Sequence, residues 1–176
     1  MSTDAKKLIT DTEYLQQERL AETKSEFYQG QITATAGASA VHNALVGALI
    51  GELYAQLKGS DCQAMPSDLR VKVEATGRYT YPDVTILCGK PVYEDGEMDT
   101  LLNPKVIIEV LSPSTEAHDR GKKFGSYRTI PALEEYILVS QDEPKIECFR
   151  RQNAFWVLQE SLGKNDVMTL ASVKAV

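Results

Sequence analysis

Hydrophobic and polar residues along the chain follow two different spacings, and together these predict an α/β fold. Apolar positions recur at helical spacing in three segments, which predicts helices at 10–22, 41–58 and 115–129. Shorter apolar runs, bounded by Gly, Pro, Asn or Asp, predict strands at about 63, 69–74, 83–88, 105–112, 135–139, 145–151 and 155–159. The segment 26–35 is predicted to be a strand or a bent hairpin with Gly30 as its flexible point. We therefore expect one α/β domain over residues 1–176, with a mixed central sheet flanked by helices.

The predicted strand 105–112 contains a carboxylate among apolar residues. Its run VIIEVLSPST places five apolar side chains around Glu109 and ends in a Ser-Pro-Ser turn, which is typical of a buried strand. Burying an ionised carboxylate without a partner costs several kcal/mol. Because side chains alternate along a strand, Glu109 shares its face with Ile107 and Leu111. The sequence thus predicts a partner for Glu109 on that face.

A second carboxylate, Asp83, begins the predicted strand 83–88. Pro82 cannot donate a ladder hydrogen bond, which places Asp83 at the start or edge of its strand. If the two strands are neighbours, Asp83 and Glu109 meet at one end of the sheet. Such a pair suits Mg²⁺, which takes one or two protein carboxylates and leaves positions for water and phosphate. The alternatives are a turn-capping Asp83 and a Glu109 satisfied by backbone amides or one salt bridge.

The predicted helix 115–129 supplies a cation for these carboxylates. Asp119, Lys123 and Tyr127 are four residues apart and share one face. The chain turns directly after the Glu109 strand, so this helix packs back over the sheet and carries Lys123 toward Glu109. An ammonium there could orient a water and stabilise charge on a phosphate. Lys123 could instead be a surface lysine, but the stripe favours it over Lys122.

These residues resemble the PD-(D/E)xK nuclease superfamily. Pro82-Asp83 resembles the PD element, and Glu109-Val110-Leu111 resembles the (D/E)xK element with leucine in the lysine position. The chain is similar to the Uma-two family of restriction-endonuclease homologues over the run NPKVIIEVLSPSTEAHDRGKKFGSYRTIPALEEYILV. In that family a lysine of the next helix, here Lys123, replaces the strand lysine. The segments KSEFYQGQITATAGASAVHN, SDLRV and YPDVTILCG also match. The sequence departs from the family pattern in two places. It ends at residue 176, short of the family's usual C-terminal apolar tail, and it has GQ where the family more often has GE at Gly30.

The resemblance implies a restriction-endonuclease-like fold and hydrolysis of a phosphodiester, in DNA, with Mg²⁺ or Mn²⁺. Asp83 and Glu109 would hold the metal, and Lys123 would position the attacking water. The resemblance adds Glu26, which otherwise could form a surface salt bridge. It also adds His42, which lies on the apolar stripe of its helix and otherwise would be a buried histidine bonded to backbone.

Composition and charge bring in a second reading. The formal net charge is -6, whereas tight binding to nucleic acid depends on neutralising phosphates. This favours an alternative of another class, a catalytically silent nuclease-fold module that binds nucleic acid or oligomerises. Hydrolysis of another phosphate ester fits the same residues.

The cysteines and the N-terminus bear on the compartment. Cys62, Cys88 and Cys148 are far apart and form no CxxC pair, so we expect neither a zinc site nor a disulfide. No apolar run approaches the ~18 residues that span a membrane, and the N-terminus lacks a signal core. These features predict a cytoplasmic protein without membrane contact.

The predicted terminal hairpin is unusually apolar for an outer element. It carries Phe149, Phe155, Trp156 and Val157. A two-fold dimer is the commonest way to cover such a patch, so the sequence predicts a homodimer.

Overall fold

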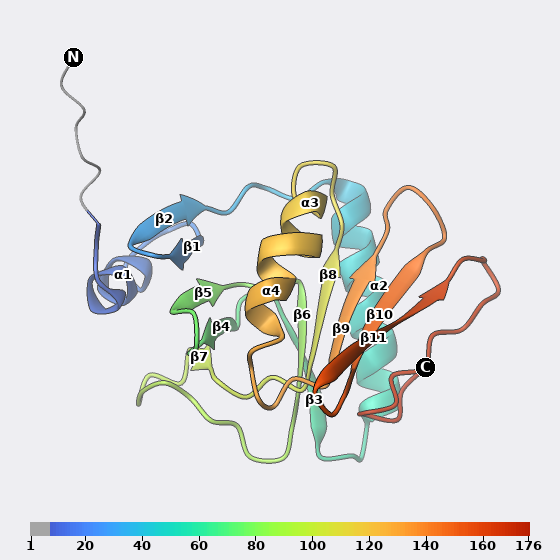
Figure 1. Ribbon diagram of the computed structural model, residues 1–176. Coiled ribbons are helices and arrows are strands. Elements are labelled where there is room, and N and C mark those ends of the chain that lie inside the picture. Colours follow the sequence, from blue (N-terminus) through green and yellow to red (C-terminus); the bar gives the residue numbers. More distant parts are fainter. Residues whose placement is uncertain (1–7) are drawn as a thin grey trace.

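A six-stranded sheet forms the centre of the fold, and helices pack on both of its faces (Figure 1). The computed structural model describes residues 8–176. Residues 1–7, which are part of the N-terminal segment that was predicted to lack a signal core, lie outside the described residues. The strand order is β11-β10-β9-β8-β6-β3, and within this sheet only β8 and β9 are parallel. The strands are β3 (Cys62–Pro66), β6 (Val84–Cys88), β8 (Val106–Val110), β9 (Glu135–Val139), β10 (Ile146–Gln152) and β11 (Phe155–Ser161).

A second, five-stranded sheet lies beside the first, where the sequence predicted only one sheet. Its order is β2-β1-β5-β4-β7. Its strands are β1 (Ser25–Tyr28), β2 (Gln31–Ala34), β4 (Arg70–Val73), β5 (Arg78–Thr80) and β7 (Thr100–Leu101). β5 and β7 were not predicted because strands of three and two residues are too short to show an alternating pattern. Gly77, with φ of +64°, makes the tight turn from β4 into β5.

The helices lie where the sequence predicted them, with two differences: the first helix ends earlier than predicted, and the third contains a π-helical turn. α1 (Asp11–Glu18) ends before residue 22, because the Glu18 carboxylate accepts hydrogen bonds from the Ser25 amide (2.8 Å) and the Tyr81 hydroxyl (3.0 Å) as the chain turns into β1. α2 (Ala40–Leu57) matches its prediction. The predicted helix 115–129 consists of α3 (Glu116–His118), a π-helical turn η1 (Asp119–Lys123) and α4 (Phe124–Tyr127).

Alternate residues of β8 face two different cores. Val106, Ile108 and Val110 belong to the cluster that α2 covers, which the C-terminal segment completes through Met168, Leu170, Val173 and Ala175. Ile107 and Leu111 belong to the opposite cluster, with Tyr127 and Tyr136. Glu109 lies between Ile108 and Val110 and is 3% exposed. It is therefore buried in β8, as its apolar neighbours predicted.

The expectation of no disulfide is wrong: Cys62 and Cys88 are joined. These residues lie opposite each other in the antiparallel pairing of β3 with β6, and their Cα atoms are 3.9 Å apart. Strand pairing thus brings together two cysteines that are distant in sequence. Cys148 is free and buried, and burial raises the pKa of its thiol to about 11. Within residues 8–176 no helix is both long and apolar enough to cross a bilayer.

The C-terminal segment is fastened to the central sheet by Glu135, which is fully buried in β9. Its carboxylate accepts hydrogen bonds from the Arg150 guanidinium at 2.8 Å, from the Ala171 and Ser172 amides at 3.2 and 3.1 Å, and from the Ser172 hydroxyl. The carboxylate thus satisfies donors from β10 and from the end of the chain at once.

We expect Glu135→Gln to lower the free energy of unfolding by about 2 kcal/mol, because charge-assisted hydrogen bonds are lost and buried donors face an amide NH₂ group. Urea unfolding measures this. The control is Glu134→Gln, whose carboxylate is exposed in a surface ion pair and should contribute less than about 1 kcal/mol. Equal stability of the two variants would contradict the fastening role.

Candidate active site

Asp83 and Glu109 lie side by side where β6 begins and β8 ends. β6 pairs antiparallel with β8, and Val84 is opposite Ile108, which brings the preceding Asp83 next to Glu109. The Asp83 amide donates to Glu109 Oε2 at 3.3 Å, and the Val110 amide donates to Asp83 Oδ2 at 2.8 Å. The two carboxylates predicted from the sequence are thus neighbours at one end of the central sheet.

Lys123 is the cation at the centre of the cluster. Its Nζ lies 3.1 Å from Glu26 Oε1, 3.2 Å from Glu109 Oε1 and 3.5 Å from Asp119 Oδ1. These carboxylates come from β1, β8 and the π-helical turn. Lys122 is exposed. The structure therefore brings Glu26 and Lys123 to Glu109, as expected, and leaves Lys122 outside.

The π-helical turn η1 carries two members of this cluster. Asp119 and Lys123 begin and end the turn, and both are buried. The Tyr136 hydroxyl donates to the Asp119 carbonyl at 3.1 Å, which holds the turn on the sheet. π-helical turns are rare and occur frequently at functional sites. The stripe formed by Asp119, Lys123 and Tyr127 thus faces Glu109, although the turn between them is not α-helical.

His42 reaches the cluster from the other face of the sheet through Asp83. Ser39 caps α2 by accepting a hydrogen bond from the His42 amide at 3.1 Å. His42 Nε2 lies 3.1 Å from Asp83 Oδ2, and among residues 8–176 its buried Nδ1 has no hydrogen-bond partner. The side chain of His42 therefore contacts a carboxylate of the predicted pair.

Sequence reasoning missed two hydroxyl groups of the cluster. The Tyr127 hydroxyl donates to Glu109 Oε1 at 2.9 Å and lies 3.1 Å from Thr80 Oγ1. Thr80 in turn donates to Glu26 Oε1 at 2.6 Å. Tyr127 was recognisable from its place on the Lys123 stripe. Thr80 lies on β5, which left no signal in the sequence pattern.

Arg78, also on β5, is a second cation that the sequence did not indicate. It is 3% exposed, its guanidinium lies 4.1 Å from the centre of the Tyr28 ring, and its Nε donates to Ser126 Oγ at 3.2 Å. Burial lowers the pKa of His118 and the Arg78 charge adds to this effect. The Arg78 charge also helps Lys123 to lower the pKa of Glu26 against burial.

Charge in the cluster is unbalanced, because one lysine, Lys123, contacts three carboxylates, of which Glu109 and Asp119 are buried and Glu26 is partly buried. The pKa of Glu109 is raised to about 8, chiefly by burial; the attraction of Lys123 lowers it, and the charges of Asp83, Asp119 and Glu26 act in the same direction as burial. Burial likewise raises the pKa of Asp119. For Glu26, burial acts in the same direction, but the Lys123 charge and the Thr80 hydrogen bond outweigh it and lower the pKa. The carboxylates keep the pKa of Lys123 well above its usual value despite burial.

The donor set fits a divalent cation held by two carboxylates. Within residues 8–176 no group of three or more His, Cys, Asp or Glu side chains is placed to hold a metal ion. Mg²⁺ needs fewer, because it commonly takes one or two protein carboxylates and completes its shell with water and substrate oxygens. The raised pKa of Glu109 indicates that Lys123 does not neutralise the carboxylates around it. Asp83 and Glu109 would hold the cation.

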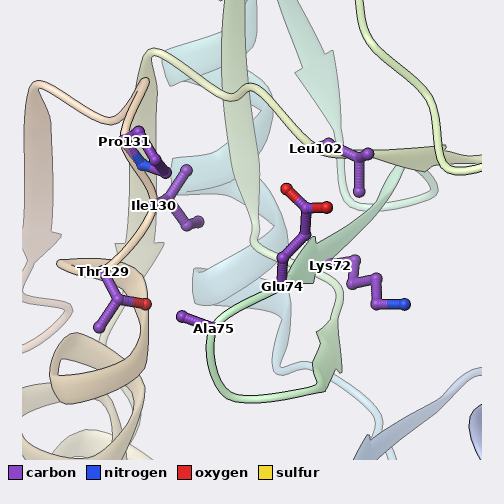
Figure 2. Close-up of a pocket in the computed structure, with 7 residues that line it drawn as sticks. All are labelled: Lys72, Glu74, Ala75, Leu102, Thr129, Ile130 and Pro131. Carbon is purple, nitrogen blue, oxygen red and sulfur yellow. The ribbon is translucent and has the colours of Figure 1, made fainter.

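A cavity of about 150 Å³ lies away from this cluster (Figure 2). It is lined by Lys72, Glu74, Ala75, Leu102, Thr129, Ile130 and Pro131. Figure 2 shows these side chains on β4 and the turn after it, directly after β7, and on the turn that follows α4. None of the five predicted site residues lines it. The candidate site is therefore the carboxylate–lysine cluster and not this cavity.

Comparisons with known proteins agree with the motifs. The chain is 38% identical over 169 residues to "Uncharacterized protein sll1609" of Synechocystis sp., covering 96% of each chain. It is 37% identical over 145 residues to "Uncharacterized protein slr1290" of the same organism, covering 82% of this chain and 75% of that one.

The fold is shared with a solved structure. The crystal structure of a "putative nuclease belonging to DUF820" from Anabaena variabilis superposes with a TM-score of 0.76 at 19% identity and covers 94% of this chain and 91% of that chain. The predicted restriction-endonuclease-like α/β fold is confirmed, with the second sheet as an addition. Residues 11–175 match the family model Uma2, described as "Putative restriction endonuclease". The chain therefore belongs to the Uma2 family, as its motifs predicted.

Proposed function

We propose that this protein is a metal-dependent endonuclease that hydrolyses phosphodiester bonds in DNA. Family membership supports a nuclease-like function. The observation that carries the finer proposal is the contact of Asp83 with Glu109 at a strand end, beside a lysine that has more carboxylate neighbours than it can neutralise.

Each residue of the cluster has a distinct part in this proposal. A bound Mg²⁺ or Mn²⁺ would polarise the phosphoryl oxygen and lower the pKa of a water molecule. Asp83 and Glu109 would supply its protein ligands. His42 and the Val110 amide orient Asp83 through contacts at 3.1 and 2.8 Å. Lys123 stays protonated because of its carboxylate neighbours, so it offers a fixed positive charge to a phosphate.

Glu26 serves Lys123 in this arrangement. Its lowered pKa keeps it ionised beside the ammonium, and Thr80 fixes its orientation. Tyr127 fixes the orientation of Glu109 by donating a hydrogen bond to its Oε1. Glu26 and Tyr127 are therefore positioning residues, which act on substrate only through Lys123 and Glu109.

The test is cleavage of supercoiled, linear and single-stranded DNA with Mg²⁺, with Mn²⁺ and with EDTA. We expect metal-dependent cleavage by the wild type and a loss of at least about 100-fold in Asp83→Asn, since removing one preorganised electrostatic group has effects of this size. Asparagine can still accept the hydrogen bond from the Val110 amide, so the strand end should keep its shape.

The matched control is Asp68→Asn, whose side chain is 86% exposed, and which should cleave like the wild type. Cleavage that persists in EDTA or in Asp83→Asn would contradict the proposal. Metal binding without cleavage of any of the three substrates would instead favour the catalytically silent module, to which the net charge of -6 is better suited.

A further inference from the structure

Arg78 is a buried cation that no carboxylate contacts within residues 8–176. It is 3% exposed. Its guanidinium contacts the Ser126 hydroxyl at 3.2 Å, His118 Nε2 at 3.5 Å and the ring of Tyr28, whose centre lies 4.1 Å away. All three partners are neutral, since burial and the charges of Arg78 and Lys123 lower the pKa of His118. The guanidinium is therefore held in place without being neutralised, and a charge in this state favours an anion.

The guanidinium also has hydrogen-bond donors to spare. Arginine carries five N–H donors in a planar fork. Arg78 uses its Nε for Ser126 and one hydrogen of its Nη1 for His118. Its Nη2 has no acceptor among residues 8–176, yet the protein does not enclose this atom as it encloses Nη2 of Arg70. The Nη2 end of the fork is therefore open to solvent.

Strand pairing places Arg78 next to the carboxylate–lysine cluster. β1 and β5 pair antiparallel, so that Tyr28 lies across from Arg78 and Glu26 lies across from Thr80. Side chains two residues apart on a strand share one face, so Arg78 and Thr80 point the same way, about 7 Å apart along β5. Glu26 in turn contacts the Lys123 ammonium at 3.1 Å. Arg78 is thus one step along β5 from the Glu26–Lys123 pair.

Arg78 lies on the far side of this pair from the proposed metal ligands. Lys123 contacts Glu109 directly at 3.2 Å. Among the described residues Arg78 contacts neither Asp83 nor Glu109, and its charge acts on Glu26, whose pKa it helps to lower. A phosphate at the Nη2 end of Arg78 is therefore a different phosphate from one held between the metal and Lys123.

We propose that Arg78 binds a phosphate of the substrate strand that is not the one cleaved. This inference rests on the proposed function, in which the scissile phosphate lies beside Lys123. Successive phosphates of one strand are about 3.4 Å apart along a duplex axis, so a step of about 7 Å corresponds to one or two nucleotides. A guanidinium suits this task because its fork can donate two parallel hydrogen bonds to phosphate oxygens.

The contact has a consequence for the class of substrate. Phosphate contacts fix the position of a strand and do not read its sequence. A small phosphate ester with a single phosphate cannot reach Lys123 and Arg78 at once, whereas a polynucleotide can. Arg78 therefore favours a nucleic-acid strand over other phosphate esters. It also supplies local positive charge to a protein whose formal net charge is -6.

The test is the salt dependence of binding to a short single-stranded oligonucleotide. Fluorescence anisotropy measures it with Ca²⁺ in place of Mg²⁺, and the length of the recovered strand shows that it stayed intact. Each neutralised phosphate contributes about 0.7 to the slope of log K against log salt concentration. We expect Arg78→Gln to bind at least about tenfold more weakly, with a slope smaller by about that amount.

Two further variants separate charge from structure. Arg78→Lys should keep the wild-type slope, because it keeps the charge, but bind at least about threefold more weakly, because an ammonium cannot form the fork. Arg128→Gln is the matched control: it removes the same charge from an exposed arginine at the end of α4 and should bind like the wild type. Circular dichroism checks folding, and Arg78→Lys decides the question if Arg78→Gln does not fold.

The inference would be overturned by a wild type that binds no strand, by an unchanged slope in Arg78→Gln, by an equal loss in Arg128→Gln, or by wild-type affinity in Arg78→Lys. In cleavage with Mg²⁺, the loss in Arg78→Gln should appear in KM and not in kcat, because the contact is made before and during the reaction alike. A loss confined to kcat would also overturn it. If the wild type binds with the expected slopes but cleaves nothing, the proposed cleavage fails while the phosphate contact of Arg78 is supported.

Discussion

Lys123→Met is expected to lower the free energy of unfolding by about 3–5 kcal/mol at neutral pH, the range found when one partner of a buried ion pair is removed. The reason is that Glu26, Glu109 and Asp119 all pair with the Lys123 ammonium, and the last two side chains are 3% exposed. Methionine fills much of the same volume, so the loss reports charge and not packing. Chemical unfolding at several pH values measures it.

The pH dependence of this loss has a definite sign. Without the ammonium, the buried carboxyls have raised pKa values in the folded protein. Over the pH range between the unfolded and folded pKa values, the folded variant therefore binds protons that the unfolded chain has released. Stability of the variant therefore falls as pH rises between the unfolded and folded pKa values and recovers toward acid. Lys122→Met is the control, with an exposed lysine in the same turn, and should match the wild type. A Lys123→Met protein as stable as Lys122→Met would show that the cluster is not ionised.

Glu26→Gln and Glu109→Gln are expected to change stability in opposite directions without metal. The pKa of Glu26 is lowered in the fold, so its ionised form is stabilising, and we expect its loss to cost about 1–3 kcal/mol. The pKa of Glu109 is raised, so its ionised form is destabilising at neutral pH. Glu109→Gln should then be at least as stable as the wild type, because Lys123 keeps Glu26 and Asp119 as partners.

Melting in EDTA at neutral pH compares the two variants directly, since each replaces one carboxylate that contacts Lys123 by an amide of the same shape. Stability of the wild type itself should fall relative to Glu109→Gln as pH rises from the ordinary carboxyl pKa of 4.5 toward the raised value. Destabilisation of the same size in both variants would mean that Glu109 is simply another partner of Lys123.

The sequence was most informative where long apolar runs define strands. β9 was predicted residue for residue, and β6 and β8 within two residues at each end, because continuous apolar runs ended by Pro or Gly are unambiguous. The pairing of Asp83 with Glu109 was predicted by the same reasoning. An acid inside an apolar run has to find a partner, and Asp83 begins the neighbouring strand.

What the sequence did not reveal depends on contacts between distant segments. β5 is too short for a periodic signal, so Arg78 and Thr80 could not be placed near the cluster. The Cys62–Cys88 pair arises only once β3 aligns with β6. The π-helical turn preserves the Asp119, Lys123 and Tyr127 stripe while changing the geometry that links them, and residue spacing alone cannot distinguish it from an α-helix.

The central claim is that Asp83 and Glu109 together hold a divalent cation, and thermal melts of wild type and Glu109→Gln with EDTA and with excess Mg²⁺ test it most directly. A ligand that binds only the folded state raises the melting temperature by mass action. We expect Mg²⁺ to raise the melting temperature of the wild type clearly and that of Glu109→Gln not at all, although the variant melts no lower than the wild type in EDTA. The claim would be contradicted if Mg²⁺ left the melting temperature of the wild type unchanged, or if it raised the melting temperature of Glu109→Gln by the same amount.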